Sequence, residues 1–326
     1  MTLAPAVRPL LICATEVVHA ERLSPSFVRV HLAAPELADL GVGPRSFDQR
    51  VKLVFPDHVD GPLPVVPDGE DWYADWLALP QPDRGHMRTY TVRDVLGSGA
   101  DTRLVVDLVV HGVEGPAGGG HGEAGPGSRW AAAARPGSRV VLVGPRRGMP
   151  YGGIEFDPPA GAELLLAGDE TAVPAVLATL AQLEPTARGA AFLEVPLAGD
   201  VPSAVHPEGV RVTWLPREGA THGSLLHAAV LEHLGAGAGA AAVVPDVPEA
   251  EVDPELWETP THSSSGEELE PVVHTVGDDL ADVYAWIAGE SRVVTGLRRA
   301  LVRDLGLDRR RVAFMGYWRE GRPMGA

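Results

Sequence analysis

Hydrophobic and polar residues alternate in short runs over the first half of the chain, and prolines and glycines separate these runs. The runs are rich in β-branched residues, and helical periodicity is nearly absent before residue 128. A period of two places successive side chains on opposite faces of a strand, so we expect a small antiparallel β-barrel in this half. The runs that predict strands are residues 27–35, 50–56, 88–95, 103–113 and 138–145.

The second half of the chain follows a different pattern, in which short apolar runs alternate with segments of helical periodicity. Residues 162–168 are apolar in the manner of a strand that is buried on both faces. Strands that alternate with helices predict a parallel, doubly wound α/β sheet. The expected strands are residues 162–168, 189–196, 210–216, 282–290 and 311–318, and the expected helices are residues 169–183, 223–235 and 291–306.

A glycine- and proline-rich seam at residues 152–162 separates the two patterns, so we expect two domains, 1–153 and 160–326. Two segments follow neither pattern. Residues 116–128 have low complexity, and residues 235–273 are acidic, contain prolines and lack periodicity. We interpret the second segment as a flexible insertion in the C-terminal domain.

Composition narrows the class of protein. The chain has 326 residues, of which 45% are hydrophobic, so it can bury a sizeable interior. It has no apolar stretch near the ~20 residues that a membrane span requires, and its first residues do not form a secretion signal. A formal net charge of −17 argues against nucleic acid as a partner. We therefore expect a cytoplasmic protein, a monomer or weak dimer, with neither a membrane nor a nucleic-acid partner.

Rare residue types exclude several kinds of site. Cys13 is the one cysteine, so a disulfide within the chain, a cysteine-rich zinc site and a four-cysteine iron–sulfur cluster are excluded. Lys52 is the one lysine, and no G-x-x-x-x-G-K phosphate loop or G-x-S-x-G elbow exists. His222, His227 and His233 lie near one expected helix, but no two of them are four residues apart, so they do not form a zinc pair. We expect no protein-bound metal.

The sequence RTYTVR, residues 88–93, carries the most informative chemistry. Arg88 and Arg93 suit bidentate pairing with phosphate oxygens. Tyr90 offers a flat face for stacking, and the Thr91 hydroxyl can approach a ring nitrogen. This combination suits a flavin dinucleotide, which has a pyrophosphate and a flat ring system. The alternative is an ordinary strand surface with ion pairs between strands.

A short helix is expected to start at Ser128, which we interpret as its N-cap, with backbone amides that face an anion. The alternative is a capped helix without a ligand. Residues 118–127 include a G-x-G-x-x-G spacing, but Pro126 and Gly127 follow it instead of a helix, so we interpret this segment as a loop.

Two similar turns are predicted at the ends of buried strands. The sequences AGDETAVPA, residues 167–175, and AGES, residues 288–291, each place an acid after Ala-Gly. Ligands of open α/β sheets bind beyond the carboxyl ends of strands, so the two turns predict a cofactor crevice. The alternative is that the acids only cap helices. The candidate crevice residues are Gly168, Asp169, Glu170, Thr171, Glu290 and Ser291.

In order along the chain, these motifs resemble the siderophore-interacting protein family, the FAD-dependent ferric-siderophore reductases. The resemblance extends from about Val17 to Arg322. It implies a flavin-binding β-barrel of the ferredoxin reductase type, followed by an NAD(P)H-binding α/β domain. The matching pieces are RLSPSFVRVHL, FDQRVKLVFP, RTYTVR, VVHGVEGPA, SRWA, AGDETAVPA, YAWIAGES and GYWREG.

The resemblance also implies a reaction. NADPH or NADH reduces FAD, which passes single electrons to iron(III) held by a siderophore, and the iron(II) produced is released. Tyr90 and Thr91 are the catalytic candidates, and Arg50, Lys52 and Arg319 are candidates for binding the anionic ferric siderophore. The FAD-binding candidates are Arg88, Tyr90, Thr91, Arg93, Asp107, Val109, His111, Ala117, Ser128 and Trp130.

This chain departs from the family pattern in two places. The glycine-rich residues 118–127 intervene before the serine of SRWA, and residues 235–273 are expanded. Relatives with an iron–sulfur cluster need several cysteines, so we expect the cluster-free type that takes electrons from a nicotinamide. Two alternatives remain open: a general NAD(P)H:flavin oxidoreductase, and a siderophore-binding flavoprotein with little turnover.

Overall fold

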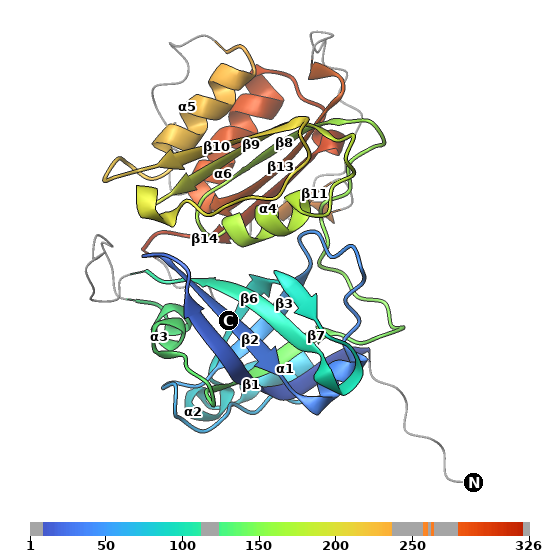
Figure 1. The fold of residues 1–326 in the computed structure, drawn as a ribbon, viewed down its shortest axis with the longest axis vertical. Helices are drawn as coiled ribbons and strands as arrows, with labels where there is room; N and C mark the ends of the chain where they lie inside the picture. Colours follow the sequence, from blue (N-terminus) through green and yellow to red (C-terminus); the bar gives the residue numbers. More distant parts are fainter. Residues whose placement is uncertain (1–8, 112–123, 237–256, 260–261, 264–279, 322–326) are drawn as a thin grey trace. The chain divides into compact units, whose positions relative to one another are not determined.

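Figure 1 shows the fold of the protein in a computed structural model, which describes residues 9–111, 124–236, 257–259, 262–263 and 280–321. The chain divides into two compact units with the boundary between Ile154 and Glu155. Each unit is built on one seven-stranded sheet. The predicted architecture, an antiparallel barrel-like sheet followed by a parallel α/β sheet, is confirmed.

The N-terminal sheet is antiparallel, with the order β4-β3-β7-β1-β2-β6-β5. Strand β5 begins three residues after β4 ends and pairs with β6, so the chain itself joins the two edges and the sheet curls into a barrel. Backbone bonds from Val92 N to Gln49 O, at 2.8 Å, and from Arg93 N to Val105 O, at 2.9 Å, secure this junction. The strands are β1 (Leu10–Arg22), β2 (Phe27–Ala33), β3 (Arg50–Phe55), β4 (His86–Thr91), β5 (Asp94–Leu96), β6 (Arg103–Val109) and β7 (Arg139–Pro145).

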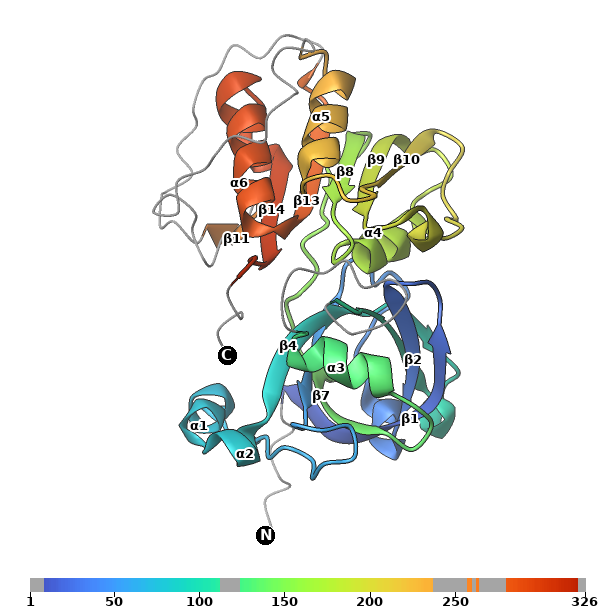
Figure 2. The same ribbon diagram turned by 90° about the vertical axis from the view of Figure 1, so that its left-hand side faces the viewer.

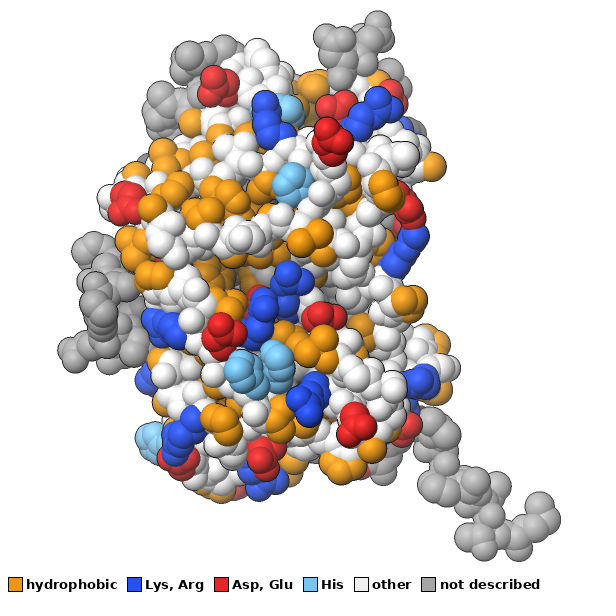
Figure 3. Space-filling view, viewed as in Figure 1, with side chains coloured by type: hydrophobic (Ala, Val, Ile, Leu, Met, Phe, Trp, Pro, Cys, Tyr) orange, Lys and Arg blue, Asp and Glu red, His pale blue; other side chains and the backbone are white. Residues whose placement is uncertain are grey.

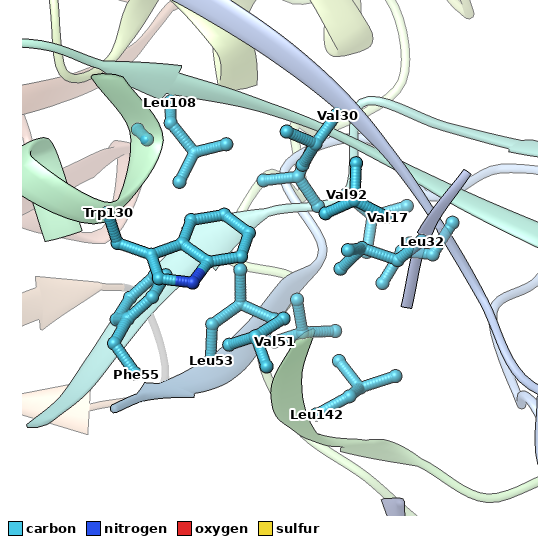
Figure 4. Packing of buried hydrophobic residues seen from close by; sticks show 14 of the residues in the cluster. Val17, Val30, Leu32, Val51, Leu53, Phe55, Val92, Leu108, Trp130 and Leu142 are labelled. Atoms are coloured by element: carbon cyan, nitrogen blue, oxygen red, sulfur yellow. The ribbon is translucent and has the colours of Figure 1, made fainter. Parts of the chain in front are cut away.

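The barrel interior is filled by alternate residues of its strands, as a period of two requires. Val51, Leu53 and Phe55 of β3 are fully buried there. Helix α3 (Pro126–Ala133) adds Trp130, whose ring lies 5.2 Å from that of Phe55 between centroids, and Figure 4 shows the two side by side. The hydrophobic cluster therefore extends from the sheet to this helix.

Three elements of the barrel unit were not predicted. Strand β1 has a clear alternation of buried and exposed residues. Helices α1 (Trp72–Ala78) and α2 (Gln81–Arg84) lie between β3 and β4, where no helix is expected from the pattern. Trp76 of α1 is fully buried, and its indole N–H donates to the Arg84 carbonyl at 2.9 Å. This bond and Trp76's burial against Val54 and Met87 fix the helices on the outside of the sheet.

The C-terminal sheet has the order β10-β9-β8-β13-β14-β11-β12, in which β8 to β10, β13 and β14 are parallel. Helices α5 (Ser224–His233) and α6 (Ser291–Arg298) cover one face, and α4 (Val173–Leu180) lies on the other (Figures 1 and 2). The strands are β8 (Glu163–Gly168), β9 (Arg188–Val195), β10 (Val210–Pro216), β11 (Trp257–Thr259), β12 (His262–Ser263), β13 (Val283–Glu290) and β14 (Val312–Trp318).

The strand order reverses between β8 and β13. From β8 the chain proceeds outward through β9 to β10, and from β13 it proceeds in the opposite direction to β14. Crevices of doubly wound sheets open at such a switch point, beyond the carboxyl ends of the strands. Gly168 ends β8 and Glu290 ends β13, so both predicted turns lie at this point.

Some predicted boundaries in this unit are wrong. The helix expected at 169–183 spans only Val173–Leu180. The helix expected at 291–306 is present as α6 followed directly by a π-helix, Arg299–Asp304, and ends two residues before the predicted end. Strand β11 pairs with β14 and β12 pairs with β11, so the predicted flexible insertion 235–273 supplies the last two strands at this edge of the sheet. Most of that segment lies outside the described residues.

No helix in the described part of the chain is long and apolar enough to cross a membrane. On the face shown in Figure 3, basic and acidic side chains are interspersed among hydrophobic ones, and neither sign covers it.

Candidate functional site

Arg88 and Tyr90 lie on the same side of β4. In the β3–β4 pair they stand opposite Leu53 and Val51, whose side chains fill the barrel. Residues directly opposite each other in an antiparallel pair share a face. The Tyr90 ring contacts Phe55 edge to face, with 5.8 Å between centroids. Burial raises the pKa of Tyr90, so its hydroxyl stays protonated at neutral pH and remains a hydrogen-bond donor.

Arg88 is a half-buried cation that lacks a carboxylate partner among the described residues. Its guanidinium donates to the Met87 carbonyl at 2.7 Å. Burial lowers the pKa of Arg88 from its ordinary value, which reflects the cost of holding a charge there. Partly buried arginines are normally paired, and an anionic ligand would supply the missing charge.

Helix α3 begins next to Tyr90. Its first turn contains Pro126, which suits the first position of a helix, and Gly127, which is buried. A Cβ atom at Gly127 would collide with the Tyr90 hydroxyl oxygen. The interpretation of residues 118–127 as a loop that ends before the helix is therefore wrong at its last two residues.

Ser128 does not cap this helix, because Gly125 holds the N-cap position. The Ser128 hydroxyl instead donates to the Val109 carbonyl at 3.2 Å and accepts the His111 N–H at 3.3 Å. It thus ties α3 to the end of β6. Trp130 is buried, and its indole nitrogen has no partner among the described residues. Ala117 lies outside them.

Thr91 and Arg93 alternate with Tyr90 and point to the outer face of the barrel. Asp107, which is buried there, accepts from Arg29 in a bidentate pair at 2.7 Å for both bonds. The Arg93 Nε lies 3.6 Å from the same carboxylate. The structure thus unites Arg93 with Asp107 and Arg29, and does not bring it to Arg88. For Arg93, this matches the ion-pair alternative.

The candidate substrate cations lie in two places. Arg50 and Lys52 share the outer face of β3, and Lys52 Nζ donates to the Thr89 hydroxyl at 3.3 Å. Burial, and then the charge of Arg50, lower the pKa of Lys52. Arg319 belongs to the other unit, where it is 6% exposed and thus not a surface arginine.

Asp169 is the centre of the candidate crevice in the C-terminal unit. Its Oδ1 accepts the backbone N–H of Thr171 at 2.8 Å and the Thr171 hydroxyl at 2.5 Å. Its Oδ2 accepts the backbone N–H of Glu290 at 2.7 Å and the Trp318 indole N–H at 2.8 Å. One buried carboxylate therefore connects the ends of β8, β13 and β14, as the sequence predicted for the first two.

Glu290 and Ser291 are engaged within the protein. The Glu290 carboxylate caps α6 by accepting from the backbone of Arg292 at 2.6 Å and Val293 at 3.1 Å. The Ser291 hydroxyl donates to the Trp318 carbonyl at 2.9 Å. The capping alternative accounts for this turn, and direct contact of these side chains with a cofactor stays a prediction.

The glycines of the two turns serve close packing. Gly289 has a φ of +148°, and a Cβ there would lie 2.6 Å from the Asp169 Oδ2. A Cβ at Gly168 would collide with Ala172. The space that these glycines leave is filled by protein atoms, so they do not open the crevice to a planar ring.

Glu170 is held by Arg217, which sequence reasoning missed. The guanidinium contacts both Glu170 oxygens, at 2.7 and 2.9 Å, and reaches Glu194 at 3.3 Å. Glu194 is completely buried in β9 and also accepts the backbone N–H groups of Gly223 at 2.6 Å and Leu226 at 2.9 Å. The available signal was a charged residue inside the apolar run 189–196.

His222 and Trp318 were also missed as site residues. The His222 Nε2 lies 3.4 Å from the Asp169 Oδ2 and 3.7 Å from the Glu170 Oε2. Its ring meets that of Trp318 edge to face at 5.2 Å. Ligand atoms of Asp169, Glu170 and His222 lie within 4.8 Å of one another, in the manner of a metal site. The two carboxylates, however, already accept several protein donors.

Residues 16–149 match the siderophore-interacting FAD-binding domain, and residues 161–321 match the family described as siderophore-interacting protein. An uncharacterized protein of Mycobacterium tuberculosis is 35% identical over 321 residues, which are 97% of this chain and 93% of that protein. The ferric vibriobactin reductase ViuB of Vibrio cholerae is 32% identical over 203 residues, which cover 62% of this chain and 65% of ViuB.

Solved structures agree with this assignment. A siderophore utilization protein from T. fusca is 30% identical, with a TM-score of 0.65 and coverage of 98% of this chain and 96% of that one. A ferredoxin reductase in carbazole 1,9a-dioxygenase, 14% identical with a TM-score of 0.52 and coverage of 96% and 71%, shares the fold alone. The resemblance inferred from the motifs is confirmed, and the chain belongs to the siderophore-interacting protein family.

Proposed function

We propose that this protein is an NAD(P)H-dependent, FAD-containing ferric-siderophore reductase that releases iron by reducing iron(III) to iron(II) in the chelate. The observation that carries the proposal is the half-buried Arg88 beside Tyr90 and the start of α3, which has no carboxylate partner in the described part of the chain. The name of the relative ViuB, a ferric vibriobactin reductase, supports the choice of electron acceptor.

The residues of the barrel unit fit FAD. Arg88 would hold the pyrophosphate by charge-assisted hydrogen bonds, and the first-turn amides of α3 would add donors of the same kind. Tyr90 brings an aromatic ring and a neutral hydroxyl to this place. Gly127 keeps room for that hydroxyl, and Ser128 fixes the helix to β6. When bound, the flavin would accept hydride from a nicotinamide and release electrons one at a time.

The residues of the C-terminal unit suit a reduced nicotinamide at the switch point between β8 and β13. Several carboxylates lie there, and a ring that becomes positively charged as it loses hydride is stabilised by nearby carboxylates. The same charges disfavour phosphate, so the phosphates of the dinucleotide belong further out. The charged side chains described at this end of the sheet include the carboxylates of Asp169, Glu170, Glu194 and Glu290 and the cations Arg217, His222 and Arg319.

The substrate would be an anionic ferric siderophore. Arg50 and Lys52 place two neighbouring cations on the outer face of β3, and these suit oxygen-rich anionic chelators. Iron(III) is small and triply charged, so oxygen ligands hold it strongly, whereas iron(II) carries less charge and is held less strongly. Reduction therefore releases the metal without cleavage of the chelator or ligation by the protein.

The visible spectrum of the purified protein tests the proposal. A flavin spectrum that bleaches on anaerobic addition of NADPH is expected of the reductase. A coloured protein that does not bleach would indicate a flavin carrier without turnover. A reduced flavin that oxygen reoxidises far faster than ferric siderophores do would indicate the general flavin reductase instead.

A further inference from the structure

His222 occupies a fixed position although it lies in the connection between β10 and α5. The residue that follows it, Gly223, caps α5 with a φ of +78° and donates its N–H to the buried Glu194 at 2.6 Å. A Cβ at Gly223 would collide with the Val293 side chain of α6. The backbone next to His222 is thus fixed by β9 and α6, which places the imidazole in a defined location.

The imidazole and the Trp318 indole share one oxygen atom. Trp318 Nε1 donates to the Asp169 Oδ2 at 2.8 Å, and the His222 Nε2 lies 3.4 Å from the same atom. The two rings are nearly perpendicular, at 86°, with 5.2 Å between centroids. A change in the charge of His222 therefore affects Trp318 in two ways. It alters the surroundings of the Asp169 carboxylate, which accepts from the indole, and it alters the imidazole ring that packs against the indole.

The charges around His222 favour its cationic form. Burial alone would lower the pKa of this histidine, but the carboxylates of Glu170 and Asp169 more than offset burial and raise its pKa to about 9. Arg217 opposes them, because it is a cation close to the ring. Two further carboxylates belong to this network. Glu194 is connected to it through Arg217, and Glu290 is connected through the bond from its backbone N–H to Asp169. A neutral imidazole would leave Asp169 and Glu170 with Arg217 as their neighbouring cation.

A metal ion is a poorer occupant of the cluster. Both Asp169 oxygens accept hydrogen bonds, and both Glu170 oxygens pair with Arg217. A metal would have to displace these donors as well as the proton of His222. The arrangement is an ionic network whose titratable member is His222.

We propose that His222 is a positioning residue of the crevice: its imidazolium, held between Asp169 and Glu170, fixes the Trp318 indole at the carboxyl end of β14. This inference rests on the proposed function in so far as the crevice is assigned to a nicotinamide. Trp318 is only partly buried, so part of this residue remains exposed at the carboxyl end of β14. Deprotonation of His222 would loosen this ring and slow hydride transfer to the flavin.

The positioning role is tested first without any nucleotide. The emission of Trp318 is obtained as the difference between the wild-type protein and Trp318→Phe, between about pH 6 and pH 10. We expect one transition near the His222 pKa of about 9, absent in His222→Gln and at lower pH in Asp169→Asn. His222→Lys should retain the acid-form emission throughout, since lysine stays charged. An emission independent of pH, or a transition that persists in His222→Gln, would overturn the inference.

Stopped-flow flavin reduction by NADPH then separates this inference from the proposed function. His222→Gln should reduce its bound flavin several-fold more slowly than wild type near pH 7, and the difference should vanish above about pH 9. His233→Gln, at the exposed C-terminal end of α5, should react like wild type at every pH. If NADPH reduces the flavin in neither protein while the Trp318 transition is present, the proposed donor is wrong and the positioning role stands. Equal rates at all pH values would contradict the role in hydride transfer.

Discussion

The Asp169 carboxylate accepts the backbone N–H of Glu290 at 2.7 Å, and this bond joins the two strands that flank the switch point of the C-terminal sheet. The same oxygen occupies the space that a side chain at Gly289 would require. The turn after β8 and the turn after β13 are therefore one packed unit. Arg217, His222 and Trp318 extend this unit to β10 and β14.

Asp169→Asn should destabilise the protein, because an amide nitrogen would replace one of two acceptor oxygens and face an N–H or O–H donor. We expect a loss of about 1–3 kcal/mol in the free energy of unfolding, measured by urea denaturation. Asp282→Asn is the matched control, because Asp282 is exposed just before β13. Equal unfolding midpoints for both variants would show that the Asp169 network adds little stability.

Gly127→Ala should weaken FAD binding, because the added methyl group displaces the Tyr90 hydroxyl. Gly125→Ala is the matched control two residues earlier, where a Cβ meets no atom within 4 Å. Titration of the apoprotein with FAD measures both affinities. If Gly127→Ala binds FAD with wild-type affinity, Tyr90 does not contribute to the flavin site.

Arg88→Ala should lower FAD affinity by roughly 1.5–3 kcal/mol, on the order of tenfold or more, because a charge-assisted contact is lost. Arg93→Ala should leave FAD affinity nearly unchanged, because Arg93 pairs with Asp107 on the opposite face of the barrel. Flavin content after purification and FAD titration report on both. Loss of flavin from Arg93→Ala alone would reverse these two assignments.

His222 should make stability depend on pH in the alkaline range. Its pKa in the folded protein is raised to about 9, above the ordinary 6.5, so its contribution is complete below about pH 6.5 and is lost as pH rises through about 9. The full contribution is at most about 3 kcal/mol. Wild type should therefore exceed His222→Gln in unfolding free energy at pH 6, and the two should converge by about pH 10. A difference that does not vary with pH would assign His222 to packing alone.

The periodicity of the sequence predicts most of the barrel, because a half-buried sheet imposes a period of two. Strand β1 was not predicted, because the polar residue Thr15 occupies an inward position between apolar residues. Its hydroxyl donates to the Val140 carbonyl at 2.9 Å, which satisfies a polar group that the pattern alone assigns to the surface. Helices α1 and α2 are too short to show a helical period.

The turns after β8 and β13 could be predicted to meet because neighbouring parallel strands end at the same edge. The partners of Asp169 and Glu170 could not be predicted, because Arg217 and His222 come from the connection between β10 and α5. Ser128 was misplaced for a related reason: a serine before a helical segment suggests a cap, whereas the helix begins two residues earlier at Pro126. Which oxygen a side chain reaches depends on tertiary packing that no local pattern contains.

The most direct test of the reductase assignment is an anaerobic single turnover of the purified flavoprotein. The enzyme-bound flavin is reduced with one equivalent of NADPH, excess nucleotide is removed, and a ferric siderophore is added with an iron(II) trap. We expect the oxidised flavin spectrum to return while trapped iron(II) forms, with two iron(II) for each flavin because the reduced ring holds two electrons. A flavin that stays reduced in the presence of the ferric siderophore, and regains its colour only when oxygen is admitted, would show that the protein is not a ferric-siderophore reductase.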